Sequence, residues 1–226
     1  PERNNALADH VYGQDGSFTS HEKGCSPFRL NGPTSLTIVD QGSSGVLYRL
    51  LVSDTHNHRV LMFDLPPGIR SDPTALWGQG QNLHNSEPNA GGLGPSTLNL
   101  PAGLAVNPEG TLWVADQGNN RVLGFDQGIH GDRLADRVLG QVDLHHATCN
   151  LTDGLSLTNP RDIAIDRTST PNRLYICDFD NNRILGYSSI DKLGPFTLPT
   201  LVIGQSDLFS NLPGTGRTGL FLPAAI

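Results

Sequence analysis

A ten-residue segment that recurs at a constant interval limits what this chain can fold into more than any other feature. Each copy reads Asp-x-x-Asn-x-Arg, then Val or Ile, Leu, any residue and an aromatic residue. The copies begin at Asp54, Asp116 and Asp178, so both intervals are 62 residues long. Self-similarity at a fixed period is typical of chains built from stacked structural units. We therefore expect three equivalent units in tandem.

Two further landmarks recur with the motif. A Gly-Gln pair follows each motif and also occurs near the start of the chain, at residues 13–14, 78–79, 140–141 and 204–205. A proline precedes each short apolar stretch that opens a unit, and these prolines are Pro33, Pro101, Pro160 and Pro223. The landmarks divide each unit into the same succession of short segments.

Each unit is expected to contain four short strands. In the second copy they are Leu104–Val106, Leu112–Ala115, Arg121–Phe125 and Val138–Gln141, which are rich in Val, Leu and aromatic residues. Gly, Pro, Asn or Asp residues bound these segments, as is typical of strands separated by turns. No segment has the length and period of an amphipathic helix. Four strands at a fixed period predict an all-β fold, a β-propeller of four-stranded antiparallel blades.

The predicted blades lie within a single domain over residues 1–226. Their approximate ranges are 33–79, 101–141 and 160–205, with partial strands of further blades at 10–14 and 223–226. Propellers close with roughly four to eight blades, so three complete blades do not make a ring alone. Two interpretations stay open and are compatible: the sequence is a fragment of a longer polypeptide, which we favour, or other copies complete or extend the array.

The motif residues suit a turn between the second and third strands. Asp accepts hydrogen bonds from nearby backbone amides, and Asn tolerates the left-handed conformation. Arg can reach a carboxylate, most simply the motif Asp of its own or a neighbouring blade. Because these residues recur in every unit, we interpret them as architecture. They are Asp54, Asn57, Arg59, Asp116, Asn119, Arg121, Asp178, Asn181 and Arg183.

The binding surface is expected where the blade-to-blade loops and the motif turns meet. The loops from Gln79 to Pro101 and from Gln141 to Pro160 are long, and long loops are disproportionately functional. In a four-stranded meander they emerge on the same face as the motif turns. The candidates for this face are the variable turn residues His56, Gln117 and Phe179.

The charge balance argues against nucleic acid as a partner. The chain has 15 Lys and Arg against 22 Asp and Glu, and its formal net charge is −7. Nucleic-acid binders usually carry a basic field. The apolar runs are also far shorter than the roughly 18 residues of a membrane span. We therefore expect neither nucleic-acid binding nor membrane insertion.

No group of residues predicts catalysis, a cofactor or a metal. Residues 214–219 fit the pattern G-x-G-x-x-G, but they lie in a loop and not between a strand and a helix. His56 and His58 stand near Asp54, and imidazole with carboxylate suits zinc or copper. The equivalent positions in the other units hold no histidine, so an exposed polar turn is the preferred interpretation.

Three cysteines and one glycosylation sequon complete the candidate features. Cys25, Cys149 and Cys177 match no metal or redox spacing, and one disulfide with a free thiol or three buried thiols are equally compatible with the sequence. Asn150 opens an Asn-x-Thr sequon, which matters only in a secreted chain.

The unit cores resemble those of the NHL-repeat family, as Leu112-Trp-Val-Ala-Asp116 and Leu174-Tyr-Ile-Cys-Asp178 illustrate. The long period with Gly-Gln is similar to that of large secreted or surface-exposed bacterial NHL proteins. The resemblance implies a propeller, commonly of six blades, at an extracellular or cell-surface location. Together with the missing catalytic group, it favours a non-enzymatic scaffold that binds a protein partner or other copies of itself.

Two other activities occur in proteins that the repeats resemble. One is a metal-dependent lyase that cleaves peptidyl-hydroxyglycine, so a metal-dependent lyase or hydrolase is the alternative function. The other is RNA binding by NHL domains of animal tripartite-motif proteins. The histidines of this chain do not recur at one blade position, and its net charge is −7. Neither activity is therefore the preferred one.

Overall fold

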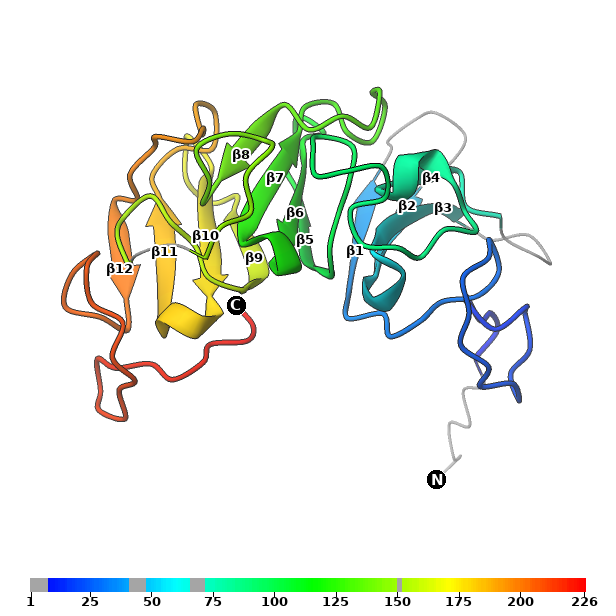
Figure 1. The fold of residues 1–226 in the computed structure, drawn as a ribbon, viewed down its shortest axis with the longest axis horizontal. Helices are drawn as coiled ribbons and strands as arrows, with labels where there is room; N and C mark the ends of the chain where they lie inside the picture. Colours follow the sequence, from blue (N-terminus) through cyan, green and yellow to red (C-terminus); the bar gives the residue numbers. More distant parts are fainter. Residues whose placement is uncertain (1–7, 41–47, 66–71, 150–151) are drawn as a thin grey trace.

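A computed structural model describes residues 8–40, 48–65, 72–149 and 152–226. Within these ranges twelve strands form three four-stranded antiparallel sheets, each in chain order (Figure 1). The predicted all-β fold of four-stranded blades is confirmed. Blade 1 contains β1 (Ser35–Asp40), β2 (Tyr48–Asp54), β3 (Arg59–Leu65) and β4 (Ala75–Trp77); blade 2 contains β5 (Pro101–Val106), β6 (Leu112–Asp116), β7 (Arg121–Phe125) and β8 (Arg137–Leu139); blade 3 contains β9 (Pro160–Asp166), β10 (Arg173–Asp178), β11 (Arg183–Tyr187) and β12 (Leu201–Ile203).

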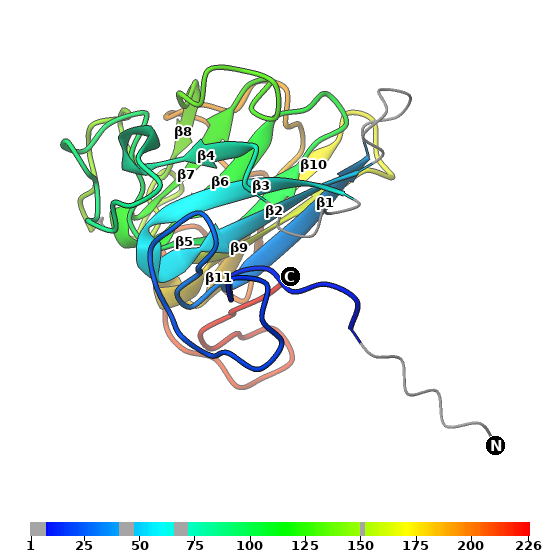
Figure 2. The same cartoon turned by 90° about the vertical axis from the view of Figure 1, so that its right-hand side faces the viewer.

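The blades stack side by side with their first strands innermost. β5 contacts both β1 and β9, so these three strands lie next to one another at the centre. The fourth strand forms the outer edge of each blade (Figure 1). Viewed from the side, blade 1 faces the reader with the other two behind it (Figure 2). The described chain is an open fan and not a closed ring.

The motif turn has the same conformation in all three blades. A three-residue 3₁₀ turn follows the motif aspartate, at η1 (Thr55–Asn57), η3 (Gln117–Asn119) and η4 (Phe179–Asn181). The next residue is left-handed, with φ between 52° and 54°, and it is His58, Asn120 or Asn182. Asn and His are enriched among the non-glycine residues that adopt this conformation. The turn then feeds directly into the third strand.

The strand register brings the two charged motif residues together. Asp54 pairs with Arg59 across the antiparallel strands β2 and β3, and the same pairing joins Asp116 to Arg121 and Asp178 to Arg183. Directly opposed residues project to the same side of a sheet. The spacing of the motif therefore fixes an aspartate beside an arginine in every blade.

Two apolar cores lie between the blades. Blades 1 and 2 share one, to which Met62, Trp77, Leu104 and Phe125 contribute. Blades 2 and 3 share the other, around Trp113 and a set of branched residues, Val122, Ile163, Ile176 and Leu185. Sheets with apolar residues on both faces need a neighbour on each side. Blade 2 has one on each side, and its strand β5 is buried throughout.

Register shifts occur at the start of two inner strands. In β5 the pairing shifts between Pro101 and Leu104. In β9, Pro160 pairs with Asp178 and Asp162 pairs with Cys177, which leaves Arg161 as an extra residue. A bulge of this kind re-aims side chains and is common beside functional sites.

The structure corrects some of the expected strand limits. β8 ends at Leu139 and not at Gln141, because Gly140 adopts a φ of 89° and leaves the strand. Among the described residues, 10–14 and 223–226 belong to no strand, and Gln14 forms an isolated bridge to Arg29. No helix in the described ranges is long and apolar enough to cross a membrane.

Candidate functional site

Each repeat motif forms a buried ion pair. The arginine Nε donates to the aspartate Oδ2 at 2.7 Å in all three blades, and both side chains are fully buried. The motif asparagine donates to the same oxygen, and a backbone N–H of the preceding loop, from Asn31, Asn99 or Thr158, donates to the other. Burial raises the pKa of each aspartate, while these donors oppose that rise. A geometry repeated three times serves the architecture.

The same arginines anchor the long loops between blades. In blade 2, Arg121 Nη1 donates to the carbonyl of Leu144 in the following loop, at 2.6 Å. Its Nη2 donates to the carbonyls of Gly94 and Thr97 in the preceding loop. Arg59 and Arg183 make equivalent sets of bonds. Each motif arginine therefore ties its own blade to two consecutive loops.

The left-handed residue of each turn reaches the next blade. Asn120 Oδ1 accepts from the N–H of Asn159, and Asn182 Oδ1 accepts from that of Leu222, both at 2.9 Å. In blade 1 the equivalent acceptor is His58 Nδ1, 3.0 Å from the N–H of Leu100. Burial, followed by the neighbouring His56, lowers the pKa of His58. His58 is thus a neutral structural acceptor.

Positions that vary between repeats meet at the inner end of the blades. In blade 1 the residue after the repeat proline bonds the first turn residue, with the hydroxyls of Thr34 and Thr55 2.6 Å apart. In blade 3 the guanidinium carbon of Arg161 lies 3.7 Å from the centroid of the Phe179 ring. This constant framework presents different side chains at each blade, which is what a binding surface requires.

A cavity of about 270 Å³ opens at this place. Its lining consists of Gln117 and the two residues after each of the four repeat prolines, namely Thr34, Ser35, Ala102, Gly103, Arg161, Asp162, Ala224 and Ala225. The residues after Pro223 thus line it together with the inner strands of the three blades. We call this the axial cavity.

The expected binding-face residues separate in the structure. Gln117 lines the axial cavity, and Phe179 lies beside it under Arg161. His56 is exposed, packs beside Gly32 and does not line the cavity. Sequence reasoning missed Arg161. The signal was present, since the position after the proline holds Thr34, Ala102 and Arg161 in successive repeats.

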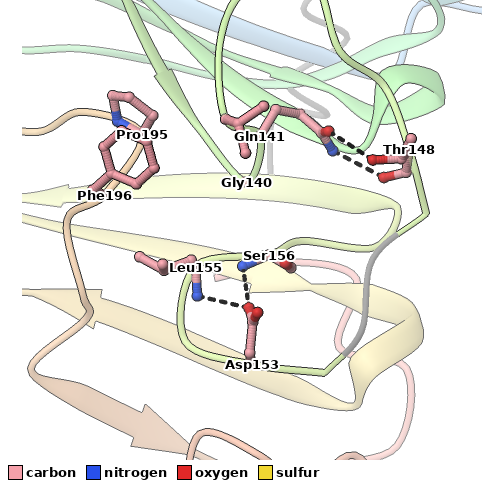
Figure 3. A pocket seen from close by; sticks show the side chains of 9 residues that line it. Gly140, Gln141, Thr148, Asp153, Leu155, Ser156, Pro195 and Phe196 are labelled. Carbon is pink, nitrogen blue, oxygen red and sulfur yellow. Dashed lines mark hydrogen bonds between the residues drawn. The ribbon is translucent and has the colours of Figure 1, made fainter.

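A second, smaller pocket lies in the long loops. It has a volume of about 140 Å³ and lies between Gln141, Asp153 and Phe196 (Figure 3). Its polar groups bond within the loop: Asp153 Oδ1 accepts the N–H groups of Leu155 and Ser156, and Gln141 Nε2 donates to the Thr148 carbonyl. These groups hold the loop together, so the axial cavity is the stronger candidate site.

The remaining candidate residues form no reactive group among the described residues. All three cysteines are free, and only Cys177 is buried, so the structure matches neither expected arrangement. Burial raises the pKa of Cys177 to about 12. No group of three or more His, Cys, Asp or Glu side chains in the described ranges could hold a metal ion. Asn150 lies outside the described residues.

Comparison with known proteins gives a consistent result. NHL repeat-containing protein 3 of Homo sapiens is 29% identical over 111 residues, which are 48% of this chain and 27% of that protein. The Mus musculus protein is 28% identical over 104 residues, 46% of this chain and 25% of that protein. The matched segment therefore spans about a quarter of the length of either relative.

A solved structure aligns weakly with this chain. A candidate 6-phosphogluconolactonase from Bacteroides uniformis aligns with a TM-score of 0.40 and 13% identity, over 72% of this chain and 41% of that one. A similarity this low carries no functional argument.

A family model described as NHL repeat matches residues 98–125, which run from the loop before β5 to the end of β7. This segment contains the motif of blade 2, and the motifs of blades 1 and 3 have the same turn and the same ion pair. The segment 98–125 thus matches the NHL repeat, and two further segments of the chain repeat its motif and its geometry.

Proposed function

We propose that this chain is a non-enzymatic binding scaffold that joins protein partners, foremost other copies of itself, through exposed apolar surfaces at the two ends of its blade array. One observation carries the proposal. Leu36 and Ile38 on the outer face of blade 1 are 64% and 56% exposed, whereas Leu104 and Val106, their equivalents in blade 2, are 6% and 2% exposed. Large exposed apolar residues on a sheet face are typical of interaction surfaces.

The opposite end of the array has a matching face. Leu201 and Ile203 of β12 are 44% and 42% exposed, whereas Leu139, the equivalent of Ile203 in β8, is 1% exposed. Blade 2 packs this same face against blade 3. The exposed strand β1 and the outer face of blade 3 therefore correspond to parts of an interface that the chain forms twice, whereas Tyr12 and Leu30 pack over Leu61 and Phe63 on the rest of the outer face of blade 1.

A second copy fits both faces in head-to-tail order. The outer face of blade 3 is equivalent to the face of blade 1 that packs against blade 2. The outer face of blade 1 is equivalent to the face of blade 2 that packs against blade 1. A head-to-tail interface forms a ring if its rotation closes and a filament if it does not. Either product supports the proposal.

Oligomeric state as a function of concentration tests this proposal. We expect light scattering after size-exclusion chromatography to show dimers or larger species, and Ile38→Asp to shift them to monomers because a charge cannot be buried cheaply. Leu134→Asp is the matched control, since Leu134 is 44% exposed in the β7–β8 loop. A compact wild-type monomer at every concentration contradicts self-association.

We also propose an extracellular or cell-surface location. The similarity to secreted bacterial NHL proteins, which the long period and the Gly-Gln pairs carry, supports it. Fractionation of cells that produce the full-length protein would test the location. Recovery in the cytosol alone contradicts it.

A further inference from the structure

The axial cavity contains an arginine whose side chain forms no ion pair with the described part of the chain. In contrast to the three motif arginines, Arg161 makes no hydrogen bond or ion pair with any described residue, and its Nε is buried without a partner. A buried donor that lacks an acceptor destabilises the fold unless a partner arrives from outside. Arg161 is therefore the polar group in the cavity that most needs a ligand.

The surroundings of Arg161 hold its guanidinium in place. It is the extra residue of the β9 bulge, and its guanidinium stacks over the Phe179 ring. Stacking on one face leaves the edge of a planar guanidinium open to accept an anion in the plane. The guanidinium of Arg161 is thus oriented before any ligand binds, which lowers the entropic cost of binding.

Two neutral donors accompany the arginine. The side chains of Gln117 and Ser35 line the same cavity and make no hydrogen bond with a described residue. Ala102, Ala224 and Ala225 supply apolar surface beside them. A small organic anion requires a cationic group, neutral polar groups and apolar surface in its binding site. The axial cavity has all three.

Asp162 limits the charge that the cavity accepts. Its carboxylate also lines the cavity, where it accepts the N–H groups of Ile163 and Ile226 at 2.9 Å. It does not pair with Arg161. A second negative charge on a ligand would lie near this carboxylate and be disfavoured. The cavity therefore suits a monoanion better than a phosphate or sulfate dianion.

We propose that the axial cavity binds the carboxylate of a small monoanionic ligand with an apolar body. The Arg161 guanidinium donates to both carboxylate oxygens, which is the planar bidentate geometry that arginine favours. Gln117 and Ser35 donate to the remaining lone pairs, and the apolar body lies against the three alanines. This site is separate from the blade faces, so it does not depend on self-association.

Calorimetric titration of the chain with sodium benzoate tests the site, with benzamide as the neutral isostere of the same shape. We expect benzoate to bind, and benzamide and inorganic phosphate to bind at least about tenfold more weakly, because benzamide cannot form charge-assisted hydrogen bonds with the arginine and phosphate brings extra charge near Asp162. The NMR signal of the Arg161 Nε–H, assigned by its loss in Arg161→Gln, should shift on addition of benzoate.

Three variants separate the site from general charge effects. Arg161→Gln should weaken benzoate binding at least about tenfold and change the unfolding midpoint little, because the loss of the stack on Phe179 is offset by removal of the unpartnered buried Nε–H. Arg217→Gln removes the same charge from an exposed loop position and should leave binding unchanged. Gln117→Leu, with the arginine intact, should weaken binding by a smaller factor.

Three results would overturn the proposal: wild-type protein that does not bind millimolar benzoate, equal binding by Arg161→Gln, or equal binding of benzoate and benzamide. Preference for phosphate over benzoate would overturn the assignment to carboxylates. None of these results bears on whether the blade faces self-associate, which light scattering measures independently.

Discussion

Strands β5 and β1 have equivalent sequences and opposite environments. Leu104 in β5 is 6% exposed, and Leu36 at the same place in β1 is 64% exposed. β5 lies between two blades, whereas the outer face of β1 has no blade against it. The difference shows that the element packed against a sheet decides which of its apolar residues become core: a blade covers β5, the N-terminal segment with Tyr12 and Leu30 covers Leu61 and Phe63, and neither covers Leu36.

The ion pairs show no such difference. Asp and Arg of the motif are fully buried in blade 1, blade 2 and blade 3 alike. Their partners lie within the blade and its two adjoining loops, all of which each blade possesses. Stability in this chain therefore has two sources: a framework that every blade carries and a face that needs a neighbour.

Loss of a motif arginine should have the largest effect, and the same effect in a central and a terminal blade. Arg121→Met and Arg183→Met each leave a buried aspartate without its cation, which costs about 3–5 kcal/mol of unfolding free energy. Urea denaturation measures this. Arg137→Met, which removes a partly exposed pair with Asp126, should cost about 1 kcal/mol or less. A much smaller cost in blade 3 would show that the framework also depends on neighbours.

Truncation of equivalent leucines should separate the two strands. Leu104→Ala empties a position between two blades and should cost about 2–5 kcal/mol. Leu36→Ala removes an exposed side chain, so its effect on the stability of the monomer should stay within about 0.5 kcal/mol. Thermal unfolding of both variants at low protein concentration makes the comparison. Equal losses would contradict the view that burial comes from the neighbouring blade.

Of the three equivalent positions, only Gly103 in the central blade should be disturbed by an added methyl group. A Cβ at this position would lie 2.5 Å from the Cα of Asp162 in the next blade, so β9 must move, at a cost of about 1–3 kcal/mol. The equivalent residues Ser35 and Asp162 carry side chains without difficulty. Gly216→Ala, with no neighbour within 4 Å, is the control for denaturation measurements. A Gly103→Ala variant as stable as wild type would mean that the blades are not in firm contact there.

The smallest expected effect is a loss of stability at low pH that arises in blade 1 alone. His58 is a neutral acceptor whose pKa lies below the ordinary 6.5, so the unfolded chain takes up its proton first as the pH falls. Wild type should lose about 1 kcal/mol relative to His58→Asn between about pH 7.5 and pH 5, the worth of one hydrogen bond. The unfolding midpoints of both proteins across this range measure the difference. Parallel pH profiles would exclude His58 as the titrating group.

The fold could be predicted because its determinants are local and repeated. The interval between Asp54, Asp116 and Asp178 indicated the unit, and the alternation of short apolar segments with turn residues indicated four strands. The spacing of Asp and Arg also indicated their contact, since it places them opposite each other across two strands. Strand ends were less well predicted: the last strand was extended to Gln141, although the recurring Gly-Gln pair marks a positive φ, which is 86° to 93° at all four of its glycines.

The axial cavity could not be predicted in this way because it depends on how blades meet. Gln117 was recognised as variable and exposed to ligand, but nothing in the sequence placed it beside Arg161. The bulge that turns Arg161 toward the cavity is a register shift, which becomes visible only when β9 pairs with β10. His56, like Gln117, is a variable residue of the motif turn, but its side chain packs beside Gly32 and lies away from the cavity.

The arginine bonds to loop carbonyls have a practical consequence for engineering. In the loop between blades 1 and 2, Leu83 and Gly94 are held by the arginines of successive blades, and the residues between them span the gap without such anchors. A foreign peptide grafted between these two fixed points would change the length of the loop but not the spacing of the blades. The chain thus offers an insertion site whose two ends are held by hydrogen bonds from Arg59 and Arg121.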